Sequence, residues 1–257
     1  MSQSQRNGTS STTGLLIGLA SIAMPVLAAA SPELQSGHIV DCPTSATGAS
    51  IDTELALPQG GLELFPDLAA FEAAVGTGLP FESFDGDYAP DPGDALGGCS
   101  EPVSSHSDDQ CFSPGDLLEG FSLTSTTSGG YVVLGDDHPQ VGHEGVAIGP
   151  QNISTPATPD VATIIEFDAD DVTAISMGTI PGCNGVTVVV QVFDLFDNFI
   201  GSTSITGETS WETSFLGFVS PQPVGRVTLR TSPSGGQLIQ DLRFGPGPEI
   251  FRDRFEQ

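Results

Sequence analysis

The stretch VTVVVQVFDLFDNFIGSTSIT, residues 186–206, decides the fold class. Its first half alternates side chains in the manner of a β-strand, with four valines on one face: Val186, Val188, Val190 and Val192. Val189 and Phe193 lie on the opposite face, so the pattern predicts a central strand covered by apolar groups on both sides. Residues 194–198 (DLFDN) predict a turn, and residues 199–206 predict the next strand.

Short runs rich in Val, Ile, Thr and Phe continue on both sides of this hairpin, separated by Gly, Pro, Asp and Asn. They predict further strands at 81–84, 120–126, 130–135, 144–149, 162–168, 172–179, 211–220, 224–231 and 237–244. One short helix precedes them, since Pro66 and Asp67 can open it and Gly76 can close it. About ten strands at this spacing indicate an all-β protein, a β-sandwich with one short N-terminal helix.

The predicted strand 224–231 has one apolar and one polar face. Val227 and Leu229 point one way, whereas Arg226, Thr228 and Arg230 point to solvent.

The first 30 residues have the organisation of a secretory signal peptide. Arg6 precedes an apolar run from Gly14 to Leu27, and Ala28 to Ala30 supply the small residues needed for cleavage. The run is shorter than the roughly 20 residues that span a bilayer, which disfavours a membrane anchor. The predicted organisation is a signal peptide at 1–30, a flexible leader at 31–60, a β-sandwich domain at 61–245 and a C-terminal tail at 246–257. The protein is therefore expected outside the cell or at its surface.

The charge of the chain excludes several functions. The chain has 33 acidic and six basic residues, a formal net charge of −27, and every basic residue is an arginine. Such a chain repels nucleic-acid backbones and anionic membrane surfaces. Without lysine it has neither a Schiff-base lysine nor a phosphate-loop lysine.

Four cysteines in a secreted chain predict two disulfides. Three pairings are possible, and the short separation of Cys99 from Cys111 favours a local bridge between them. Cys42 and Cys183 would then form the second bridge. A zinc site is the alternative, but no CxxC spacing is present and the four histidines are scattered.

Residues 85–119 differ from the rest because they are rich in Asp, Glu, Gly and Pro and contain no basic residue. We predict a long acidic loop without regular structure, held by the Cys99–Cys111 bridge. Loops of this length are often functional.

Five segments carry a resemblance to a known architecture: FESFDG at 81–86, CFSPGDLLEGFSLTS at 111–125, VVVQVFDLFDNFIGS at 188–202, LGFVS at 216–220 and LIQDLRFG at 238–245. With the opening helix, they resemble the secreted bacterial jelly-roll β-sandwich domains of PEP-CTERM-type exported proteins, whose architecture is related to carbohydrate-binding modules. The resemblance implies a jelly-roll-like fold more than any one activity. The tail IFRDRFEQ at 250–257 is similar to a short motif at the ends of secreted bacterial proteins, with Arg254 in place of Gly, and is either a sorting tag or a frayed end.

Calcium is the cofactor that the resemblance implies. In many carbohydrate-binding sandwiches a structural calcium joins the first strand to the last, and calcium needs several oxygen ligands. The matching positions are Glu82 or Asp85 near the first strand and Asp241 on the last, with Asp87 able to add an oxygen from the loop. The alternative is that Asp241 pairs with Arg243 or Arg226.

Sugar-binding sites need exposed aromatic side chains, and we select Trp211 and Tyr88 as candidate ligand-binding residues. Catalysis has little support, because neither a G-x-S-x-G nor an H-E-x-x-H motif is present. The sequence therefore predicts a non-enzymatic binding or adhesion module with an extracellular glycan or cell-surface component as partner. A structural scaffold is the first alternative, and a hydrolase of extracellular polymers is the second.

Overall fold

The computed structural model describes residues 59–126, 129–138, 144–151, 162–182, 186–206, 213–232 and 237–248. The predicted signal peptide and nearly all of the leader and the tail lie outside these ranges, as do Cys42, Cys183 and Trp211. No helix in the described ranges is both long and apolar enough to cross a membrane.

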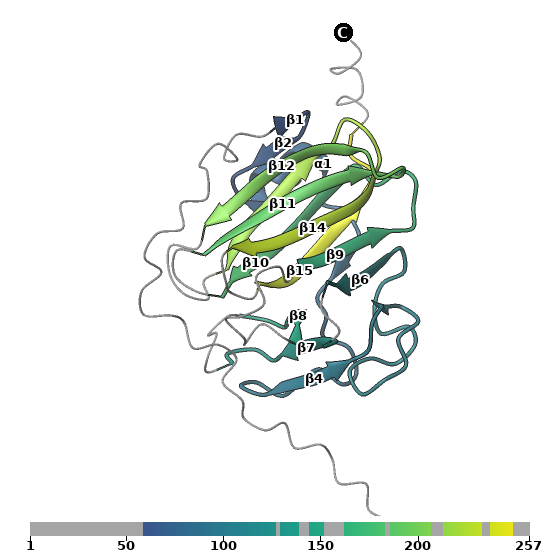
Figure 1. The fold of residues 1–257 in the computed structure, drawn as a ribbon, viewed down its shortest axis with the longest axis vertical. Helices are drawn as coiled ribbons and strands as arrows, with labels where there is room; N and C mark the ends of the chain where they lie inside the picture. Colours follow the sequence, from purple (N-terminus) through teal and green to yellow (C-terminus); the bar gives the residue numbers. More distant parts are fainter. Residues whose placement is uncertain are drawn as a thin grey trace, which may run out of the picture. The chain divides into compact units, whose positions relative to one another are not determined.

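Two antiparallel sheets make up the fold (Figure 1). The first contains β1 (Gln59–Gly60), β5 (Val103–Ser104), β6 (Phe121–Ser125), β9 (Ala162–Phe167), β11 (Thr187–Asp194), β12 (Phe199–Thr206) and β14 (Val224–Ser232). This seven-stranded sheet has the order β1-β12-β11-β14-β9-β6-β5. Figure 1 shows β12, β11, β14, β9 and β6 side by side in one layer.

The second sheet has eight strands. They are β2 (Glu63–Phe65), β3 (Phe81–Glu82), β4 (Ala95–Cys99), β7 (Tyr131–Leu134), β8 (Ala147–Pro150), β10 (Ala174–Pro181), β13 (Ser214–Val219) and β15 (Gln237–Gly245). Their order is β2-β13-β10-β15-β8-β7-β4, and β3 pairs with β15 outside this path.

The main core lies between the two sheets, because both contribute side chains to one buried cluster. The seven-stranded sheet contributes three valines of β11 that are 0% exposed: Val188, Val190 and Val192. From the eight-stranded sheet come Ile239 and Leu242, also 0% exposed. Each such burial contributes about 1.5–3 kcal/mol relative to an exposed side chain. The predicted jelly-roll-like β-sandwich is therefore confirmed.

Helix α1 (Leu68–Val75) covers part of the outer side of the eight-stranded sheet. Asp67 caps its start, with a side-chain oxygen that accepts a 2.7 Å bond from the Ala70 N–H. Gly76 ends it at φ 90°, a conformation that glycine adopts without strain. Phe71 is the buried residue of the helix and packs edge-on against Phe65 and Phe215. Both predicted ends of the helix are confirmed.

The strand β11 corrects one prediction. Its core face is buried as expected, but Val189 and Phe193 on the other face are only half-buried. Thus β11 is central in its sheet yet covered fully on one side only, since no neighbouring sheet packs over those two side chains. On β14, Arg226 and Arg230 reach the surface as predicted, whereas Thr228 is buried beside them.

The acidic segment 85–119 corrects a second prediction, because it contains the strands β4 and β5. The sequence of β4, ALGGC, has no apolar alternation and could not be recognised by its side chains. It pairs with β7 through its backbone, and Gly98 at φ 80° accommodates a register shift. The sandwich thus includes this segment.

The predicted Cys99–Cys111 disulfide is present, with the two Cα atoms 5.4 Å apart. Asp109 holds the same turn, since its carboxylate accepts N–H bonds from Ser100, Cys111 and Phe112. The predicted Cys42–Cys183 bridge lies outside the described residues.

Candidate functional site

The face of the seven-stranded sheet that points away from the core, called here the outer face, is the first candidate for a functional surface. Strand register places its side chains in rows. In the first row Phe193 of β11 lies between Arg226 of β14 and Phe199 of β12. These three strands come from distant parts of the chain, so the row exists only once the sheet has formed.

An aromatic corner, formed by Phe193, Phe196 and Phe199, stands at one end of this face. The rings of Phe193 and Phe199 meet edge to face, with centroids 5.9 Å apart at 69°. Phe199 is 49% exposed, Phe196 is 83% exposed and the adjacent Leu195 is 41% exposed. Aromatic rings at such exposure commonly mark a binding surface.

The β11–β12 turn presents this corner on an ordered backbone. The Asp194 carboxylate accepts bonds of 2.8 Å from the N–H groups of both Phe196 and Asn198. The amide side chain of Asn198 donates a third bond, of 2.9 Å. These bonds, the Asn198 side chain first, lower the pKa of Asp194. The sequence-predicted turn is therefore confirmed, and Asp194 fixes the path of the chain beneath Phe196.

Arg226 is held against the corner by three groups. Its guanidinium carbon lies 4.1 Å from the centroid of the Phe193 ring. The Nε and Nη2 groups both donate to Oδ1 of Asp197, at 3.1 and 3.0 Å. Nη1 donates to the Thr228 hydroxyl at 3.4 Å. The exposed ion pair contributes little to stability, about 0–1 kcal/mol, but it orients the guanidinium flat on the ring.

Polar side chains continue from the corner along the strands. The second row holds Thr228, Gln191 and Ser202, in register on β14, β11 and β12. In the third row Arg230 lies opposite Val189. Gln191 is half-buried and Arg230 is exposed. The outer face therefore offers aromatic rings at one end and amide, hydroxyl and guanidinium groups further along.

Three of the four predicted calcium ligands come close together in the structure, around the pairing of β3 with β15. Glu82 pairs with Leu242, the residue after Asp241. Asp241 has φ 54°, at a register shift of β15. Asp85 follows β3 closely enough to act electrostatically on both Glu82 and Asp241. Asp87 is exposed in the following loop.

Burial, not a bound cation, dominates the electrostatics of this acidic cluster. The pKa of Glu82 is raised by desolvation, opposed by N–H bonds from Leu118 and Phe84 and reinforced by Asp85. The pKa of Asp241 is raised by desolvation, while Arg243 lowers it and Asp85 raises it. Like charges near a half-buried carboxylate would favour an added cation.

The acidic cluster nevertheless does not form a ligand sphere as it stands. Both oxygens of Glu82 accept backbone N–H bonds, from Phe84 at 2.6 Å and from Leu118 at 2.7 Å. Within the described ranges, no group of three or more His, Cys, Asp or Glu side chains is arranged to hold a metal ion. Calcium binding therefore stays a prediction.

The two predicted ligand-binding aromatics do not define one site. Tyr88 is 52% exposed, but it follows β3 of the eight-stranded sheet and lies in a turn away from the outer face. Trp211 lies outside the described residues. Sequence reasoning assigned the phenylalanines to the core and missed Phe196 and Phe199. The signal that could have found them is an aromatic residue inside a polar turn, DLFDN.

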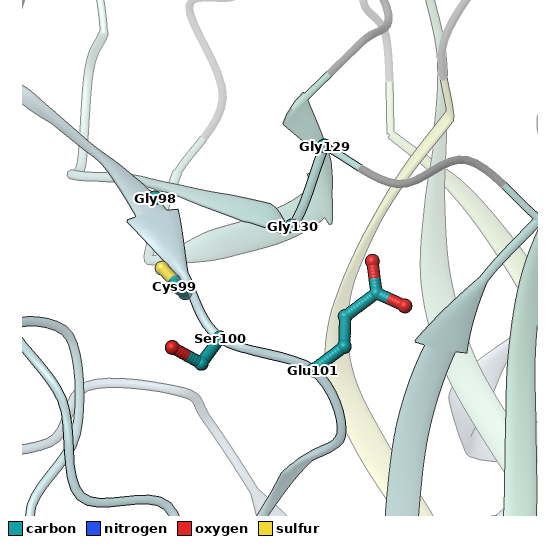
Figure 2. A pocket seen from close by; sticks show the side chains of 6 residues that line it. All are labelled: Gly98, Cys99, Ser100, Glu101, Gly129 and Gly130. Atoms are coloured by element: carbon teal, nitrogen blue, oxygen red, sulfur yellow. The ribbon is translucent and has the colours of Figure 1, made fainter.

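A separate hollow of about 420 Å³ opens between β4 and β7. Its lining is Gly98, Cys99, Ser100, Glu101, Gly129 and Gly130. Figure 2 shows the Glu101 side chain pointing away from that of Ser100. Both Glu101 oxygens accept bonds from Ser125, one from its N–H at 2.9 Å and one from its hydroxyl at 2.7 Å. Since its one charged group is engaged and no ring lines it, the hollow is a weaker candidate than the outer face.

No protein family and no curated protein matches the chain. One similar solved structure is a CBM61 carbohydrate-binding module in complex with β-1,4-galactotriose, at 14% identity, covering 50% of this chain and 89% of that one, with a TM-score of 0.34. Another is a family 29 carbohydrate-binding module variant complexed with mannohexaose, at 14% identity, 51% and 84% coverage and a TM-score of 0.32. A third is the enzymatically active domain of bacteriophage CBA120 tailspike protein 4, at 15% identity, 49% and 19% coverage and a TM-score of 0.30. A function has to be inferred from the residues of this chain.

Proposed function

We propose that the protein is a secreted, non-catalytic module that binds a polysaccharide on the outer face of its seven-stranded sheet. The observation that carries this proposal is the aromatic corner, in which Phe196 and Phe199 are exposed and Arg226 lies flat on Phe193. Secretion is the part of the proposal supported by the predicted signal peptide alone.

The chemistry of the outer face suits a sugar chain. A pyranose ring has an apolar side of C–H groups and a rim of hydroxyls. The C–H groups are attracted to the negative face of an aromatic ring, and the hydroxyls need donors and acceptors beside it. The corner supplies the rings, and Gln191 of the second row supplies both a donor and an acceptor. Several weak contacts in succession along a strand suit a polymer better than a small molecule.

A purely structural scaffold does not account for the corner. An 83% exposed phenylalanine in a turn leaves apolar surface in water, and Asp194 holds the turn in that form. A scaffold without a ligand gains nothing from this arrangement.

A hydrolase is also less well supported. Glu82 and Asp241 have raised pKa values and lie on paired strands, which could suggest a catalytic pair. However, Glu82 holds the Leu118 N–H, and neither residue lines the hollow between β4 and β7. The pair is therefore explained by its structural role.

The proposal is tested by affinity electrophoresis against a panel of soluble neutral and acidic polysaccharides. We expect wild-type protein to be retarded by at least one polymer and the double variant Phe196→Ala/Phe199→Ala to bind it at least tenfold more weakly, a loss of about 1.4 kcal/mol. The matched control is Phe81→Ala on β3. Its ring is 44% exposed and lies under Arg243 at 4.3 Å, but it belongs to the other sheet. Equal losses in the control and the double variant would contradict the proposal, as would a wild-type protein that no polymer retards.

A further inference from the structure

Arg230 occupies a defined place on the outer face. It lies on the same side of β14 as Arg226, four residues further along. At about 3.4 Å per residue, this puts the two arginines roughly 14 Å apart along the strand. A polymer lying on the aromatic corner and running along β14 would therefore pass over the Arg230 guanidinium.

The surroundings of Arg230 contain no acidic group in its own row. Its register partners are Val189 on β11 and Ala162 on β9. Within the described part of the chain, Arg230 has no hydrogen-bond or ion-pair partner. This is notable in a protein with 33 acidic and only six basic residues, where carboxylates to pair with are abundant.

The other described arginines are engaged. Arg226 pairs with Asp197 and lies on Phe193. Arg243 lies on Phe81 and donates to the Asp241 carbonyl at 3.4 Å. Arg230 alone among the described arginines keeps its whole fork of N–H donors for a group outside the protein. A guanidinium fork fits a carboxylate with two parallel bonds, and such charge-assisted bonds are about twice as strong as neutral ones.

We infer that Arg230 makes the outer face selective for acidic polysaccharides, by binding the carboxylate of a uronic acid unit while neighbouring sugar rings lie on the aromatic corner. This inference rests on the proposed function and names its substrate class. The net charge of the protein opposes a polyanion at long range, but charges more than about 8 Å away are largely screened at physiological salt. The local pairing at Arg230 therefore decides the preference.

The test compares oligomers of polygalacturonate with their methyl esters, which keep the sugar backbone and lose the charge. Isothermal titration calorimetry at physiological salt should show the acid form binding wild-type protein at least tenfold more tightly than the ester. Arg230→Gln should bring the ratio to within about twofold and leave ester affinity unchanged, since one charge-assisted pair is about tenfold in affinity. Arg230→Lys should give an intermediate ratio, because it keeps the charge without the fork. Arg243→Gln, the same change on the other sheet, should keep the wild-type ratio.

Further arms separate the sources of error. Sulfated dextran distinguishes a carboxylate site from a general anion site, and we expect it to bind more weakly than polygalacturonate. Equal affinity of wild-type protein for acid and ester would overturn the inference, as would a loss in Arg230→Gln that is equal for both. If wild-type protein binds neutral polymers but neither form of polygalacturonate, the inference fails and the proposed function stands. If it binds no polymer, both fail.

Discussion

Glu82 shows how one buried carboxylate organises its neighbourhood. It is 4% exposed and joins β3 to the end of the segment 85–119 through the Leu118 N–H. The cost is desolvation, which raises its pKa in the folded protein above the ordinary value of 4.5. An acid with a raised folded pKa binds its proton more tightly when folded. It therefore lowers the free energy of unfolding as pH rises from the unfolded value through the raised folded value.

We therefore predict that the melting temperature falls as pH rises from about 4.5 to 8, and that Glu82→Gln makes this dependence shallower. Differential scanning calorimetry across the range measures it. Exposed Glu144 provides the matched control, since Glu144→Gln removes the same charge from the surface. Parallel pH profiles for wild type and Glu82→Gln would show that Glu82 does not titrate as described.

The same calorimetry tests calcium, which we retain as a proposal for the cluster of Glu82, Asp85 and Asp241. A cation bound there would stabilise the ionised carboxylates, so calcium should raise the melting temperature more at pH 8 than at pH 5. Asp241→Asn should remove the effect. Identical melting temperatures in calcium and in EDTA would eliminate the calcium proposal and leave the pH dependence to burial alone.

At the scale of elements, the β11–β12 turn determines whether the aromatic corner can bind. Asp194 holds Phe196 and Asn198 in place by accepting their N–H groups. We predict that Asp194→Ala weakens polysaccharide binding several-fold, because Phe196 must then be ordered on binding. Competition calorimetry measures the affinity, with Asp168→Ala, an exposed acid at the end of β9, as the control. Unchanged affinity in Asp194→Ala would mean that the order of the turn is irrelevant to binding.

Elements also show what sequence alone can predict. Strands such as β11 and β14 were predictable because their side chains alternate, and α1 because Asp67 and Gly76 mark its ends. The strand β4 was not predictable, since ALGGC pairs through its backbone and carries no apolar alternation. The open outer side of β11 was also missed, because alternation reports apolar residues and not what packs over them.

At the scale of the whole molecule, the candidate site depends on contacts between distant segments. The turn at 194–198 was predictable, but the position of Arg226 beside Phe193 was not, because it requires β14 to pair with β11. Likewise Glu82 and Asp241 meet only through the pairing of β3 with β15, which the resemblance to other sandwiches suggested and local pattern could not. Sequence therefore supplied the parts of the outer face, and strand order assembled them.

Hydrogen–deuterium exchange of the full chain, with and without a polysaccharide that it retains, tests the central claim most directly. The account predicts slower amide exchange on binding in the turn 194–198 and in β14 from Arg226 to Arg230, with no change in α1 or β15. Protection confined to the eight-stranded sheet, or to the hollow between β4 and β7, would contradict the assignment of the outer face as the binding surface.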